Sequence, residues 1–254
     1  MFLLALLVPQ IAFGHSHNDY AQARPLVGAL EAGLCNIEAD VFLVDGELLV
    51  GHDRKDLKPG RTLRSMYLEP LIHPKQTSRE NGETYVRLGP LTLLVDIKED
   101  GEAVYRKLKE QLKPYADSLT SYSGGVVRKG LITVVLSGDR PVKTVLAEKE
   151  RVAFIDGRLE DLDNGTSASD IPWVSADYTE TFKTLGSPLS EPNMKKLGEL
   201  VVKAHRDGKK LRFWAAPDYP SGWEMLIKAG VDLIGTDHPA KFAQFCLEKG
   251  YVKP

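Results

Sequence analysis

The chain has 254 residues, 43% of them hydrophobic, which is enough to bury a large core in one barrel-sized domain or two small ones. The formal net charge is −2 at pH 7 and no long basic run occurs, which argues against nucleic acid binding driven by counterion release. The two cysteines, Cys35 and Cys246, are expected to be free core residues and do not indicate a compartment.

The first fourteen residues are apolar and uncharged, but they are fewer than the ~20 that a membrane-spanning helix needs. Two interpretations are open. The segment is the hydrophobic region of a secretory signal, or residues 10–14 form the first strand of the fold. A leader that ends near Val8 agrees with both. We expect an exported protein, secreted or periplasmic, and otherwise a cytoplasmic one.

Strands and helices alternate along the rest of the chain. Apolar runs predict strands at 10–14, 37–43, 91–97, 131–136, 152–155, 173–175, 211–215 and 231–236. Periodicity and end signals predict helices at 24–32, 100–118, 191–207, 222–229 and 240–249. This alternation predicts a single (β/α)₈ TIM barrel domain over residues 1–254. Residues 52–89 are polar and interrupted by proline, which is typical of a functional loop or lid.

Polar residues stand at the carboxyl ends of the predicted strands, where barrel enzymes have their active sites. These residues are His15 and His17 after the first strand, Asp96 and Lys98 at the third, Trp214 at the seventh and Asp237 at the eighth. A random scatter of polar residues would not produce this placement.

A Glu-x-Asp pair lies in the second strand. Alternation puts Glu38 and Asp40 on one face of that strand and Ile37, Ala39 and Val41 on the other. Adjacent carboxylates repel each other unless a positive charge lies between them, and a divalent cation with oxygen ligands is the usual partner. A salt-bridged strand edge is the alternative, but no basic residue alternates with the acids. We therefore predict metal ligands.

His52 joins this face only under one further assumption. If Val44, Asp45 and Gly46 form a three-residue hairpin loop, Leu43 pairs with Glu47 and the register brings His52 opposite Glu38. A two-residue loop shifts the register by one and turns His52 to the other face.

The motifs resemble the glycerophosphodiester phosphodiesterases, phosphatidylinositol-specific phospholipase C and the sphingomyelinase D toxins. Ser16-His17-Asn18-Asp19-Tyr20 is similar to the phospholipase C pattern Ser-His-Asn-x-Tyr, and Asp96-Ile97-Lys98 is similar to the family's Glu-Ile-Lys strand. Residues 212–214 and 229–237 resemble its last two strands. The HRG and PEN signatures of typical glycerophosphodiester phosphodiesterases are absent, so the resemblance does not give the substrate.

The resemblance implies that His17 is the catalytic base and Asn18 a metal ligand, although either His15 or His17 could be the catalytic member of the pair. We further expect His52 to be the acid. Because hard oxygen ligands meet at adjacent strand ends, we predict that Glu38, Asp40 and Asp96, with Asn18, hold one divalent cation, Mg²⁺ or Ca²⁺. Lys98 holds a phosphate, and Trp214 contacts the substrate.

Each residue also has a purely structural interpretation. His17 and His52 could be satisfied structural histidines, Asn18 a turn cap and Asp96 a loop cap. Lys98 could be a solvated lysine and Trp214 a core residue. Asp237, before His238-Pro239, is interpreted as a helix N-cap, and His73 and His205 as structural or solvated.

The predicted function is phosphodiester hydrolysis, or cleavage by a cyclising lyase route, of a small-molecule or lipid-derived substrate. One alternative is a zinc amidohydrolase, which needs imidazoles from middle strands, and no histidine occurs between His73 and His205. The other is a barrel that binds a phosphorylated ligand without catalysis. The sequence does not indicate the oligomeric state.

Overall fold

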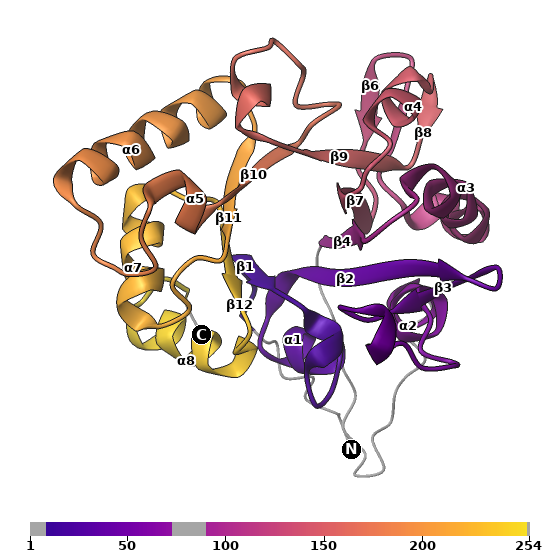
Figure 1. The fold of residues 1–254 in the computed structure, drawn as a ribbon, viewed down its shortest axis with the longest axis horizontal. Coiled ribbons are helices and arrows are strands. Elements are labelled where there is room, and N and C mark those ends of the chain that lie inside the picture. Colours follow the sequence, from indigo (N-terminus) through magenta and orange to yellow (C-terminus); the bar gives the residue numbers. More distant parts are fainter. Residues whose placement is uncertain (1–8, 73–89, 253–254) are drawn as a thin grey trace, which may run out of the picture.

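The computed structural model describes residues 9–72 and 90–252, and in them parallel strands close into a barrel (Figure 1). The barrel strands are β1 (Ile11–Ser16), β2 (Leu34–Val44), β4 (Leu91–Ile97), β7 (Ile132–Gly138), β9 (Ala153–Gly157), β10 (Trp173–Asp177), β11 (Lys210–Trp214) and β12 (Leu233–Thr236). β1 pairs with both β12 and β2, which closes the barrel. The predicted (β/α)₈ fold is confirmed.

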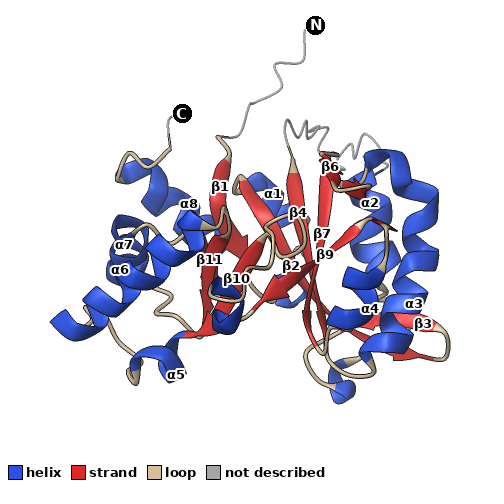
Figure 2. Cartoon of the chain, turned by 90° about the horizontal axis from the view of Figure 1, so that it is seen from above, coloured by secondary structure: helices blue, strands red, loops and turns tan. Residues whose placement is uncertain are grey.

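Helices surround this sheet on the outside (Figures 1 and 2). They are α1 (Val27–Glu31), α2 (Glu69–Ile72), α3 (Gly101–Leu112), α4 (Val142–Ala147), α5 (Tyr178–Phe182), α6 (Glu191–Arg206), α7 (Pro220–Ala229) and α8 (Pro239–Glu248). On α3 the buried residues include Val104, Leu108 and Leu112, which are four positions apart and form one apolar face. None of the helices in the described ranges is both long and apolar enough to cross a bilayer.

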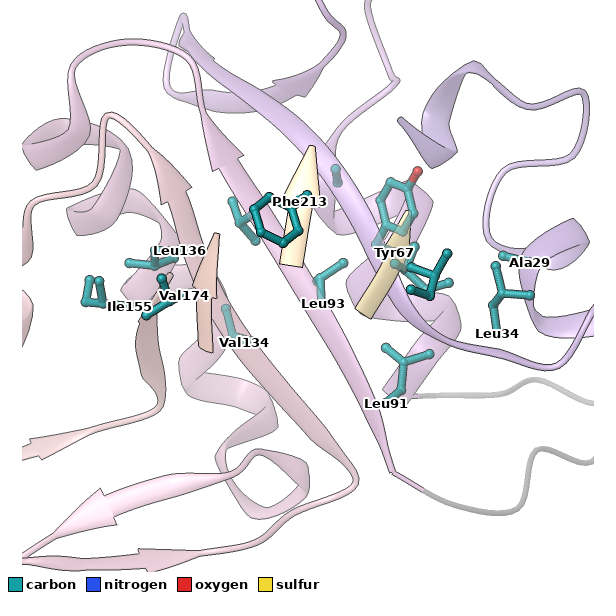
Figure 3. Close-up of a cluster of buried hydrophobic side chains, with 14 of the residues drawn as sticks. Ala29, Leu34, Tyr67, Leu91, Leu93, Val134, Leu136, Ile155, Val174 and Phe213 are labelled. Carbon is teal, nitrogen blue, oxygen red and sulfur yellow. The ribbon is translucent and has the colours of Figure 1, made fainter. Parts of the chain in front are cut away.

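The main hydrophobic core lies between the strands and these helices (Figure 3). Leu93 of β4, Val134 of β7 and Phe213 of β11 all belong to it. Ile37, Ala39 and Val41 of β2 lie in the same outer core, so the intervening Glu38 and Asp40 point into the barrel, as predicted.

Of the two loop lengths left open for the hairpin after residue 43, the structure has the two-residue loop and not the three-residue loop that would place His52 opposite Glu38. Val44 pairs with Glu47 across a two-residue loop, and β3 spans Glu47–Val50. Asp45 and Gly46 both have positive φ, 49° and 80°, which is the type I′ turn that Asp-Gly favours. The β2–β3 ladder ends at Val50, so the strand alternation does not fix the direction of the His52 side chain.

Part of the expected functional loop or lid, residues 54–72, contains short helical segments. Two short helical turns, Arg54–Asp56 and Arg64–Leu68, precede α2. Tyr67 and Leu68 are fully buried, and the Tyr67 hydroxyl donates to Asp19 Oδ2 at 3.0 Å. These core contacts tie the segment to the barrel. The remainder of the expected lid, with His73, lies outside the described residues.

A small antiparallel sheet was not predicted. It comprises β5 (Ser121–Ser123), β6 (Val126–Arg128) and β8 (Glu150–Arg151). The β5–β6 turn is formed by Gly124 and Gly125, both with positive φ, and this Gly-Gly pair was the available sequence signal. Figure 2 shows β6 at the end of the barrel where β1 and β4 begin. Three further 3₁₀ turns, Asp19–Ala21, Lys113–Ser118 and Leu159–Leu162, connect elements.

Candidate active site

Glu38 of β2 is the centre of a buried ionic network inside the barrel. One oxygen, Oε2, lies 2.6 Å from His15 Nε2 and accepts a hydrogen bond of 2.6 Å from the Arg212 guanidinium of β11. Burial opposes ionisation, but the Arg212 charge and the His15 hydrogen bond outweigh it and hold the pKa of Glu38 well below its usual range. The carboxylate is therefore ionised at neutral pH.

His15 has no exposed surface, and its ring packs edge-on against Trp173 with the centroids 6.2 Å apart. Burial and the Arg212 charge lower its pKa to about 4, so the imidazole is neutral. A neutral ring donates from Nε2 to Glu38. His15 can therefore orient Glu38, but it offers no surface to a substrate.

His17 is the accessible member of the His-x-His pair, with 32% of its side chain exposed. Its Nδ1 lies 2.8 Å from Asp237 Oδ1, and its Nε2 lies 3.9 Å from Glu38 Oε1. Burial lowers the pKa of His17, but the Asp237 hydrogen bond and the Glu38 charge raise it by more, so it lies above the usual value.

The interpretation of Asp237 as a helix N-cap is wrong. α8 begins at Pro239 with His238 at its N-cap position, and no side-chain cap is formed there. The inward alternation of β12 instead directs Asp237 toward His17, whose hydrogen bond lowers the pKa of the carboxyl.

Asp40 is the second centre of the site, and it is fully buried. Its Oδ2 lies 2.7 Å from the Tyr20 hydroxyl, 2.6 Å from Lys98 Nζ and 3.1 Å from His52 Nδ1. Its Oδ1 is buried and has no hydrogen-bond partner among the described residues. Burial and the Glu38 charge raise the pKa of Asp40 in spite of Lys98. A further positive charge beside Asp40 would therefore stabilise its ionised form.

Glu38, Asp40 and Asp96, here called the acidic cluster, are suited to a hard divalent cation. One carboxylate oxygen of each lies within 4.8 Å of the others, and Asp40 Oδ1 is free to accept. This cluster contains no imidazole, and no other group of three potential metal ligands occurs in the described ranges. The imidazole set that the amidohydrolase alternative needs is therefore not formed there.

Two other predicted site residues border the acidic cluster. Lys98 Nζ also donates to Asp96 Oδ2 at 2.6 Å, so Lys98 bridges two of the three acids. Asn18 has a left-handed backbone, with φ 46°, and its Oδ1 lies 2.8 Å from the Tyr20 hydroxyl. Asn18 therefore reaches the cluster through Tyr20, and its role as a ligand stays a prediction.

Trp214 ends β11 on the opposite wall of the barrel and is partly exposed. Its Nε1 donates to Asp177 Oδ2 at 3.1 Å, and the Arg158 guanidinium carbon lies 5.0 Å from the centroid of the indole ring system. Arg158 also donates to the buried Asp156 at 3.0 Å. The role of Trp214 as a substrate contact stays a prediction.

Sequence reasoning gave no role to Arg212, Tyr20 or Arg158. Arg212 carried a signal, because it alternates in phase with Trp214 along an otherwise apolar strand and so had to point into the barrel. The counter-ion of Glu38 was sought only beside it in the sequence. The remaining histidine predicted to be structural, His205, is exposed and pairs with Asp232 at 2.9 Å. No disulfide joins Cys35 and Cys246 in the described ranges; Cys246 is a buried core residue, as expected, whereas Cys35 is only partly buried.

A family model described as an AIM6-like phosphodiesterase domain matches residues 7–156, more than half of the chain. Altered inheritance of mitochondria protein 6 homolog of Arthroderma benhamiae is 31% identical over 88% of this chain and 80% of that protein. Altered inheritance of mitochondria protein 6 of Eremothecium gossypii is also 31% identical, over 91% of this chain and 68% of that protein.

Among solved structures, a glycerophosphodiester phosphodiesterase from Agrobacterium tumefaciens aligns with 91% of this chain and 97% of its own, at 14% identity and a TM-score of 0.49. The match of the family model and the identity to the two curated relatives are sufficient for assignment. The chain belongs to the family of AIM6-like phosphodiesterase domains.

Proposed function

We propose that this protein is a metal-dependent phosphodiesterase that cleaves a glycerophosphodiester or a phospholipid-type phosphodiester with His17 and His52. One observation carries the proposal. Two accessible imidazoles, each with Nδ1 against a carboxylate, border the three carboxylates of the acidic cluster. A base, an acid and a cation site at one end of a barrel are what phosphodiester cleavage requires.

The two histidines take different parts in this proposal. The Asp237 contact fixes the His17 ring and leaves Nε2 to remove a proton from the attacking water or substrate hydroxyl. His52, with 60% of its side chain exposed, donates a proton to the leaving alcohol. If the substrate carries a neighbouring hydroxyl, the attack is internal and the product is cyclic; otherwise water attacks and the ester is hydrolysed.

The acidic cluster supplies the cation site, to which Asn18 adds its amide oxygen. A bound Mg²⁺ or Ca²⁺ would withdraw negative charge from the phosphate oxygens. Arg212 and His15 keep Glu38 ionised and oriented, and Lys98 balances the acids and attracts the phosphate. Trp214 contacts the headgroup.

A panel of purified phosphodiesters, assayed with and without a chelator, tests the proposed activity. We expect cleavage of at least one glycerophosphodiester or phospholipid, loss of that cleavage with the chelator and its return with added Mg²⁺ or Ca²⁺. Asp96→Asn should weaken divalent binding in calorimetry, because it removes one anionic ligand. Binding of phosphodiesters without any turnover, with or without metal, would instead identify a non-catalytic barrel.

Asp237→Asn tests the role of His17 through the pH dependence of kcat/KM. A base must be deprotonated, so the rate rises with pH through the pKa of His17, which Asp237 helps to raise. The substitution should move this acidic limb to lower pH. It should also lower the plateau by about tenfold, because the charge-assisted hydrogen bond that orients the ring is lost. An acidic limb of the pH profile that stays in place or moves to higher pH would contradict the assignment of His17 as the base.

A further inference from the structure

A second pocket opens at the end of the barrel opposite the acidic cluster. It has a volume of about 380 Å³, and inward-facing residues near the starts of five consecutive strands form its walls. These residues are Thr92, Thr133, Phe154, Trp173 and Lys210. Val127 and Lys129, from the small sheet and the segment after it, contribute to the rim. Side chains normally fill a barrel interior of this size, so a hollow here calls for an explanation. We call it the basal pocket.

The basal pocket contains two lysines, Lys129 and Lys210, that lack carboxylate partners in the described part of the chain. Trp173 is 2% exposed, and its Nε1 has no hydrogen-bond partner among the described residues. Neither Lys129 nor Lys210 has a carboxylate within 4.0 Å in residues 9–72 and 90–252. Trp173 Nε1 is itself buried, so the two lysine ammonium groups are the donors that an anion in the pocket can reach.

The two lysines also act on each other. Burial and the Lys129 charge lower the pKa of Lys210, although the Asp232 charge opposes them. Asp232 lies near Lys210, but its Oδ2 is engaged by His205 Nε2 at 2.9 Å and by the Leu211 N–H at 2.8 Å. An anion between the two ammonium groups would remove their repulsion.

The rest of the lining is mainly apolar or already paired. Val127, Val135 and Phe154 are apolar, and the hydroxyls of Thr120 and Thr133 are hydrogen-bonded to each other at 2.7 Å. We propose that the basal pocket binds a small organic anion with a flat apolar body. The ammonium groups hold its carboxylate or phosphate, and the apolar residues, Trp173 among them, pack against its body.

Titration of the ¹⁵N-labelled full chain tests the proposal. The three tryptophans give three indole N–H signals, and Trp173→Phe identifies the one from the basal pocket. The probes are 2-naphthoate, 2-naphthyl phosphate and neutral 2-naphthol. Saturable movement of the Trp173 signal by either anion supports the proposal, and comparison of the two anions identifies the preferred group. Naphthol should bind about tenfold more weakly or worse, because it forms no charge-assisted hydrogen bond.

Variants make the test specific. Lys210→Met and Lys129→Met should each weaken binding of the anion about tenfold, and Lys210→Arg should retain it. Lys195→Met on the exposed surface of α6 is the matched control and should change nothing. Lys129 is exposed, so its replacement keeps the test valid if Lys210→Met does not fold. Equal affinity in both methionine variants, no movement up to millimolar probe, or movement confined to the Trp214 signal would overturn the proposal.

Discussion

Replacement of His17 or His52 by alanine is expected to reduce kcat by ~10²–10⁴-fold, which is the usual contribution of a positioned acid or base. Both groups act in one displacement, so the double variant should lose far less than the product of the two single losses. A substrate with a p-nitrophenolate leaving group needs little protonation. It should therefore restore the rate of His52→Ala and leave His17→Ala slow. Steady-state kinetics on both substrates, with metal saturating, measures these effects.

His205→Ala is the matched control, since His205 is an exposed histidine that also pairs with a carboxylate but lies outside the site. Its kcat should equal that of the wild type. His15→Ala should mainly lower stability, because His15 is fully buried against Glu38. An inactive, folded His15→Ala together with an active His17→Ala would show that the assignment of the base is wrong. Rescue of His17→Ala by the activated substrate would reverse the two roles.

Glu38→Gln is expected to lower the free energy of unfolding by about 3–5 kcal/mol, because the Arg212 guanidinium would stay buried without its counter-charge. Urea unfolding followed by circular dichroism measures the loss. Adding Arg212→Met to Glu38→Gln should recover part of it, because no unpaired charge then remains in the barrel.

Asp96→Asn gives the comparison for Glu38→Gln. Asp96 is partly exposed, and within residues 9–72 and 90–252 its side chain bonds to Lys98 alone, so its substitution should cost much less stability while still weakening divalent binding. Asp96 is for this reason the better position at which to test the cation site. A Glu38→Gln variant as stable as the wild type would show that the Glu38–Arg212 pair does not support the fold.

Local patterns predicted the elements of this chain well. β4 has the predicted bounds, and the inward direction of Glu38 and Asp40 follows from alternation within one strand. Such features depend on neighbours in the sequence, so the sequence alone reveals them. The contact between Arg212 and Glu38 in the buried ionic network was not predicted, because the two residues are 174 positions apart in the sequence.

His52 contacts the acidic cluster although the β2–β3 register differs from the one that would place it opposite Glu38. A three-residue loop would have placed His52 opposite Glu38, but the loop has two residues and the ladder ends at Val50. His52 nevertheless reaches Asp40 Oδ2, at 3.1 Å, because it lies beyond the ladder and its side chain is free to turn. Asp-Gly favours the two-residue type I′ turn, which is the turn that forms here.

The pairing of β1 with β12 also determines when the candidate active site can form during synthesis of the chain. The His17–Asp237 contact joins residues 220 positions apart, and it can form only after β12 has paired with β1. Contacts of such long range form slowly during folding, since a large loop must close before they are gained. A chain still emerging from the ribosome carries both histidines and the acidic cluster, but the partner of its proposed base is missing until the last barrel strand is synthesised. Activity should therefore arise late, in one step, with closure of the barrel.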